Sequence, residues 1–180
     1  LKIDFHLFDF NNMYKIIDID KSIKITLNEA LTEFFALIIN CIVISIELKT
    51  DKNNYLSYYK LAKLFLIYEI KFNIIQCAKI LNYFGYLNNE EFFRSHNTSK
   101  FKQNTCIISY FFVKTALLLN NKKMFDFLDD NFNMMIYKNR EVGISNFINL
   151  SCELILNPNY QKIIQKYQNK LLITNKNMHL

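Results

Sequence analysis

Residues 26–48 read TLNEALTEFFALIINCIVISIEL, and this stretch decides the fold that we expect. It contains no Gly or Pro, and its apolar residues recur at the steps of three and four that are typical of an α-helix. Thr26 and Glu29 have the spacing of a capping box, in which the hydroxyl and the carboxylate each accept a hydrogen bond from a free backbone N–H. The run from Phe34 to Ile46 is uncharged but too short to cross a bilayer. We therefore expect a buried core helix here and no transmembrane segment.

The rest of the chain has the same helical character. Its 180 residues include only 2 Gly and 1 Pro, too few for the turns of an all-β protein. Apolar spacing predicts further helices over 55–84, 88–94, 105–120, 122–130, 141–156 and 158–172, with a polar loop at 95–104 and an irregular lead-in at 1–25. The helix over 105–120 is apolar nearly all round and should lie centrally. We predict an all-α protein, a compact bundle of about five or six helices that forms one domain over residues 1–180.

Composition and charge restrict the class of protein further. The chain is 51% hydrophobic and 21% charged, which is typical of a folded globular protein. Its net charge is +6, but the basic residues are spread singly and only Arg94 and Arg140 are arginines, so we do not expect nucleic acid as a partner. The four Cys are widely spaced and form no C-x-x-C pair, which fits reduced thiols in a cytoplasmic protein.

Glu29 and Glu33 are the residues on which a chemical function could depend. They are four residues apart, so they share one face of the predicted helix. Two carboxylates beside an apolar helix repel each other and are costly to desolvate unless a cation lies between or beside them. That cation could be a Lys, an Arg or a metal ion.

The segment LNEALTEFFA, residues 27–36, resembles the third-ligand helix of gluzincin-type zinc metallopeptidases, the thermolysin-like and aminopeptidase-like group. The resemblance implies that Glu29 binds zinc, that Glu33 supports the site one turn later and that Asn28 fixes the start of the helix. It implies hydrolysis of a peptide or protein substrate, in which zinc polarises the carbonyl and activates a water. The helical bundle after the motif is similar to the C-terminal parts of these enzymes. Predicted proteins of large DNA viruses also resemble this arrangement.

The other two zinc ligands of that family are missing from this sequence. The family binds zinc through two His of an H-E-x-x-H helix, and no such motif occurs here. The histidines are His6, His96 and His179, and no two of them are four residues apart. Because the chain begins with Leu, we expect it to be the C-terminal part of a longer protein. Zinc would then be bound only with ligands from an upstream segment, and the chain as given would be inactive.

Other candidate residues each have two interpretations. His6 could be a ligand or a partly buried histidine. His96, in the polar loop, could stabilise a substrate in a peptidase cleft or be a surface residue. An aromatic stripe on a basic helix could stack nucleic-acid bases or could be core packing with solvated lysines. The stripe consists of Tyr55, Tyr58, Tyr59 and Tyr68, with Lys60, Lys63 and Lys71.

Three functions follow from these patterns. The first is the C-terminal portion of a zinc metallopeptidase-like protein, with Glu29 as a ligand. The second is a non-catalytic helical interaction protein, whose apolar helices pack against a protein partner or another copy. The third is a basic nucleic-acid-associated module. A cleft around Glu29 and Glu33 would favour the first, a large exposed apolar surface the second, and a continuous Lys-rich face with exposed Tyr the third.

Overall fold

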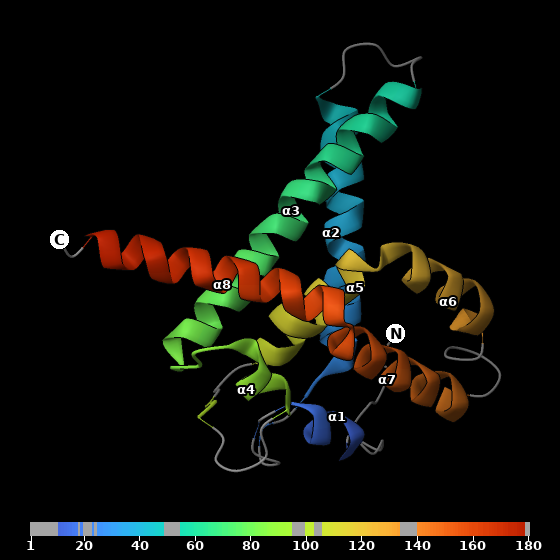
Figure 1. Ribbon diagram of the computed structural model, residues 1–180. Helices are drawn as coiled ribbons and strands as arrows, with labels where there is room; N and C mark the ends of the chain where they lie inside the picture. Colours follow the sequence, from blue (N-terminus) through green and yellow to red (C-terminus); the bar gives the residue numbers. More distant parts are fainter. Residues whose placement is uncertain are drawn as a thin grey trace.

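The computed structural model describes residues 11–17, 19, 23, 25–48, 55–94, 100–102, 106–133 and 140–178. Within these residues the protein is all-α and has no strand, as the sequence predicts (Figure 1). The elements are α1 (Asn11–Ile16), α2 (Leu27–Glu47), α3 (Tyr55–Tyr83), α4 (Asn89–Arg94), the π-helical turn η2 (Ile108–Val113), α5 (Lys114–Leu119), α6 (Asn121–Asn133), α7 (Arg140–Leu156) and α8 (Pro158–Met178).

The centre of the bundle is the continuous helix made by η2 and α5. Its Ile108, Phe112, Val113, Ala116 and Leu117 are completely buried, which confirms the predicted central position. The helix is not regular, however, because its first six residues form π-helical turns, which sequence patterns do not predict. The elements α2, α3 and α7 all contact it, so it fixes their positions relative to one another.

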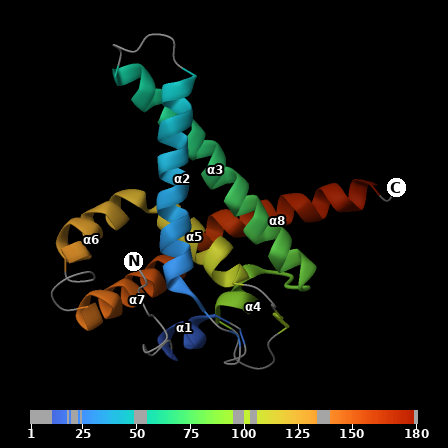
Figure 2. The same ribbon diagram turned by 180° about the vertical axis from the view of Figure 1, so that it is seen from behind.

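Two helices leave this body together. The C-terminal part of α2 and the N-terminal part of α3 run side by side and extend beyond every other described helix (Figures 1 and 2). We call this projection the α2–α3 arm and define it as residues 36–47 of α2 and 56–72 of α3. In Figure 2 α2 lies in front of α3, and its outer face is uncovered along the arm.

The ends of several helices agree with the sequence prediction. Gly85 follows α3 with a φ of 74°, the left-handed conformation in which glycine commonly ends a helix. Asn157 caps α8, since its Oδ1 accepts a hydrogen bond from the N–H of Asn159 at 2.9 Å. The predicted end of the last helix was wrong, because α8 continues beyond residue 172 to Met178.

The N-terminal lead-in and the polar loop meet at one point. Ile19 and Phe101 form an isolated parallel β-bridge, and both side chains are buried. Phe101 packs against the rings of Phe84 and Phe92, at centroid distances of 4.5 and 5.6 Å. The segment 95–104, which was predicted to be a polar loop, therefore contains one buried aromatic residue that packs against the core.

Candidate functional site

A chain of hydrogen bonds ties the start of α2 to η2. Thr26 is buried directly before α2, and its hydroxyl donates to Oε2 of Glu29 at 2.7 Å. The backbone N–H of Thr26 donates to Oγ of Ser109, in the first turn of η2, at 3.0 Å. The bond between Thr26 and Ser109 joins residues 83 apart in sequence, so it fixes the start of α2 against the core. Glu29 is bonded in turn to Thr26.

The capping box was predicted with the right residues but the wrong hydrogen bonds. The Thr26 side chain makes no capping bond to the backbone, because its hydroxyl is bonded to the Glu29 carboxylate. The N–H of Thr26, which was expected to donate to the Glu29 carboxylate, donates to Oγ of Ser109 instead. The two side chains therefore stabilise each other, and a tertiary contact satisfies the backbone donor.

Tyr110 of η2 completes the surroundings of Glu29. The negative charge of Glu29 raises the pKa of Tyr110 above its ordinary value, and partial burial and the charge of Glu33 raise it further. Glu29 is thus a half-buried carboxylate that accepts a hydrogen bond from Thr26 and acts electrostatically on the hydroxyl of Tyr110.

Glu33, one turn further along α2, pairs with a lysine. Its Oε2 lies 3.6 Å from Nζ of Lys114, the first residue of α5. The Lys114 side chain is only 10% exposed, whereas that of Glu33 is 43% exposed. The ammonium also lies 5.8 Å from the centre of the Phe111 ring. The sequence left a Lys, an Arg and a metal ion as possible cations beside Glu33, and in the structure a Lys lies there. Lys114 is the one charged residue of the apolar segment 105–120, and this was the feature of the sequence that could have identified it.

The predicted metal ligands do not come together in the described residues. Asn28 and Glu29 lie in the first turn of α2, and the Asn28 carbonyl accepts a hydrogen bond from the Thr32 hydroxyl at 2.8 Å. Within the part of the chain that the structure describes, no three His, Cys, Asp or Glu side chains are grouped to hold a metal ion. His6 and His96 lie outside the described residues. Among the described residues, Glu29 therefore does not belong to a group of three possible metal ligands.

The arm provides a second candidate site of a different kind. On α2 the prediction of a buried core helix is wrong for the C-terminal half, because only one side of it is covered, chiefly by α3. Cys41 and Ser45 face inward and are buried. The exposed large apolar residues of this half are Ile39, Ile42, Val43 and Ile46.

On α3 apolar residues are exposed as well. Ala78 and Leu81 are buried, but Leu64, Tyr68 and Phe72, which follow one another at steps of four residues, are exposed in the arm. The interpretation of the tyrosine stripe as core packing is wrong for Tyr59 and Tyr68. The exposed apolar and aromatic residues of α3 in the arm are Leu56, Tyr59, Leu64, Ile67, Tyr68 and Phe72, and between them lie the exposed Lys60, Lys63 and Lys71.

The arm meets α6 in a groove of about 550 Å³. Its lining includes Ile42 and Leu66 from the arm and Phe125 from α6, with Lys63 and Lys122 also contributing. By length and composition, α2 is the one described helix that could cross a membrane, and 28% of its most apolar window is buried. The arm therefore has an exposed apolar surface, and the exposed Lys60, Lys63 and Lys71 lie among the apolar residues of α3.

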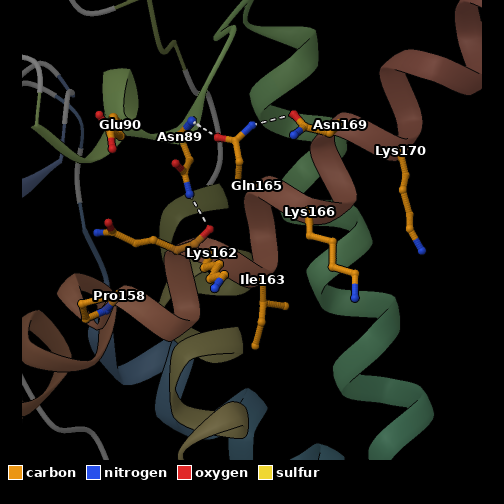
Figure 3. A pocket seen from close by; sticks show the side chains of 10 residues that line it. Asn89, Glu90, Pro158, Lys162, Ile163, Gln165, Lys166, Asn169 and Lys170 are labelled. Atoms are coloured by element: carbon orange, nitrogen blue, oxygen red, sulfur yellow. Dashed lines mark hydrogen bonds between the residues drawn. The ribbon is translucent and has the colours of Figure 1, made fainter.

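A larger open groove, of about 810 Å³, lies between α4 and α8 and is lined mainly by residues with polar or charged side chains (Figure 3). Asn89 at the start of α4 donates its backbone N–H to Oε1 of Gln165 at 2.7 Å, and Gln165 donates to Asn169 at 2.8 Å. Lysines four residues apart along α8 also line the groove, namely Lys162, Lys166 and Lys170. No tyrosine is among the described residues that line the groove, although the ammonium of Lys170 lies 5.6 Å from the ring centre of Tyr167 on the same helix.

Comparisons with protein-family models, with curated proteins and with solved structures find no match to this chain.

Proposed function

We propose that this protein is a non-catalytic helical interaction protein and that the α2–α3 arm is its contact surface. The observation that carries the proposal is the exposure of ten large apolar side chains on two neighbouring helices of one projection. Contiguous apolar surface on a folded protein is typical of an interaction site, whereas single exposed apolar residues are not. Covering a half-exposed Ile or Val contributes roughly 1 kcal/mol, so the four on α2 alone could supply several kcal/mol to association.

The chemistry of the arm favours a helical protein partner over the bilayer interior. The uncharged run 34–46 corresponds to about 20 Å of helix, shorter than the hydrocarbon core of about 30 Å. Beside it, α3 exposes Lys60, Lys63 and Lys71, which would be costly to carry into lipid. An amphipathic helix that packs along the arm would cover its apolar residues and leave these lysines in water.

The test compares the wild-type chain with the arm variant Ile39→Gln/Ile46→Gln. A control, Leu156→Gln/Ile173→Gln, changes two exposed aliphatic residues outside the arm. We expect sedimentation velocity to show association of the wild type and of the control that the arm variant lacks. Flotation with vesicles of phosphatidylcholine and phosphatidylserine tests the membrane alternative on the same samples. A wild-type chain that remains monomeric at about 100 µM and does not float would contradict the proposal.

A second candidate function is metal binding at Glu29, as in a zinc metallopeptidase-like protein of which this chain would be the C-terminal portion. The observation that favours it is the way the carboxylate is held, because metal-ligating carboxylates are usually fixed by hydrogen bonds from neighbouring groups. Thr26 provides such a bond. Two histidine ligands would have to come from outside the described residues, and peptide hydrolysis would depend on them.

The metal hypothesis is tested on the longest reading frame that contains residues 1–180. Elemental analysis should find about one zinc per chain in the wild type and in Glu47→Ala, an exposed glutamate at the other end of α2. Glu29→Ala should lose the zinc. No zinc in any of the three proteins, or equal zinc in all, would contradict a role for Glu29 as a ligand.

A further inference from the structure

The outer face of α2 has a regular pattern of exposed residues along the arm. Ala36, Ile39, Val43 and Ile46 are all exposed and are separated by three, four and three residues. This is the a/d spacing with which one helix packs along another in a coiled coil. We call these four residues the α2 seam. Since α3 packs on the opposite side of α2, where Cys41 and Ser45 are buried, the seam is free to accept a further helix.

The seam is complementary to itself when it is reversed. If a second α2 runs antiparallel and is centred at residue 41, Ala36 lies opposite Ile46 and Ile39 lies opposite Val43. Each of these layers joins an a position to a d position, and the smallest side chain meets a large one. A two-fold interface requires this property, because residue i must contact residue j and j must contact i. We infer that a second copy of this chain packs antiparallel on the α2 seam, an inference that rests on the proposed function of the arm.

The charges around the seam permit this pairing. No charged residue lies on α2 between Glu33 and Glu47, so two chains of net charge +6 can approach along the seam without like charges in contact. On the two flanks, Asn40 comes near its own counterpart, and so does Ile42. The first flank can form an amide–amide hydrogen bond, and the second extends the apolar contact.

The size of the seam predicts a weak dimer. Two seams with their flanks bury on the order of 1,000 Å² in total, the lower limit for a specific interface. We therefore expect a dimer that forms at micromolar concentrations and dissociates on dilution. Sedimentation at increasing concentration should show the mass rise from 21.6 kDa towards twice that value.

The first experiment places a charge in the seam. Val43→Lys introduces two ammonium groups into the dimer, and Leu64→Lys is the control, because the exposed fractions of the two wild-type side chains are 43% and 45%. Circular dichroism establishes that both variants fold. We expect at least a tenfold loss in the association constant for Val43→Lys and little change for Leu64→Lys. Dimerisation that survives Val43→Lys overturns the inference. If Leu64→Lys abolishes dimerisation while Val43→Lys does not, the arm is still the contact surface but the α2 seam is not.

The second experiment tests the antiparallel arrangement. A mixture of Ile39→Cys and Val43→Cys chains should form an intermolecular disulfide in mild oxidant, whereas each variant alone should form much less. A parallel pair would give the opposite result, with each variant cross-linking to itself, and would overturn the inference. If the chain stays monomeric and forms no cross-link but floats with vesicles, the inference that a second copy packs on the seam is overturned. The proposed contact function of the arm is not.

Discussion

The ion pair between Glu33 and Lys114 allows two roles of Glu33 to be distinguished, a structural role as the partner of Lys114 and a supporting role in a metal site. At 3.6 Å the attraction between the two charges is about 4.6 kcal/mol at an effective dielectric constant of 20 and about 1.2 kcal/mol at 80. Since Glu33 is 43% exposed and Lys114 10% exposed, the pair lies between these limits, and desolvation offsets part of the attraction. We expect a net coupling free energy of about 1 kcal/mol.

A double-mutant cycle measures this coupling directly. Glu33→Gln should lower the free energy of unfolding by about 1–2 kcal/mol, because it leaves the ammonium of Lys114 nearly buried without its partner. Lys114→Met should cost less, because it replaces the charged group with an apolar one, and in that background Glu33→Gln should have little effect. Urea unfolding followed by far-ultraviolet circular dichroism gives the four values. A coupling below about 0.3 kcal/mol would refute the reasoning and free Glu33 for another role.

Three further predictions concern the buried polar groups. Ser109→Ala leaves the N–H of Thr26 without its acceptor and should lower the free energy of unfolding by about 1–2 kcal/mol in urea, and an unchanged stability would contradict the contact. Burial raises the pKa of Cys77 to about 12, so this thiol should resist Ellman's reagent at pH 8 until the protein unfolds, and rapid labelling of the native state would disagree. Burial also raises the pKa of Tyr160 well above 10, so above pH 10 the unfolded state releases a proton that the native state keeps, and stability should fall as pH rises. Thermal unfolding at pH 9 and pH 11 measures this, and Tyr160→Phe should weaken the dependence.

The local features of the fold could be predicted from the sequence because they depend on neighbouring residues. The scarcity of Gly and Pro indicated long helices, and the start of α2 was placed within one residue. Gly85 and Asn157 marked helix ends through conformational preferences that operate within a single turn. The central position of the helix over 105–120 followed from its apolar residues, which would be costly to expose on any side.

The features that the sequence did not predict depend on tertiary contacts. An uncharged run such as 34–46 is the same in sequence whether or not other helices surround it, so the exposure of Ile39 and Val43 could not be read from it. Apolar spacing does not distinguish the π-helical turns of η2 from an α-helix. Ser109 of η2 contacts Thr26, and Tyr110 lies within the electrostatic influence of Glu29. The sequence predicted that a cation lies beside Glu33, but only the folded structure identifies that cation as Lys114.

Self-association through the arm is tested most directly by hydrogen–deuterium exchange of the full chain at about 1 µM and about 100 µM. A projecting helix that is covered on one side opens locally, and a partner that covers the other side should slow this opening. We predict that residues 36–46 exchange more slowly at the higher concentration, while α6 and the C-terminal half of α8 exchange at the same rate at both. Equal exchange of residues 36–46 at the two concentrations, or protection that appears only outside the arm, would contradict the account.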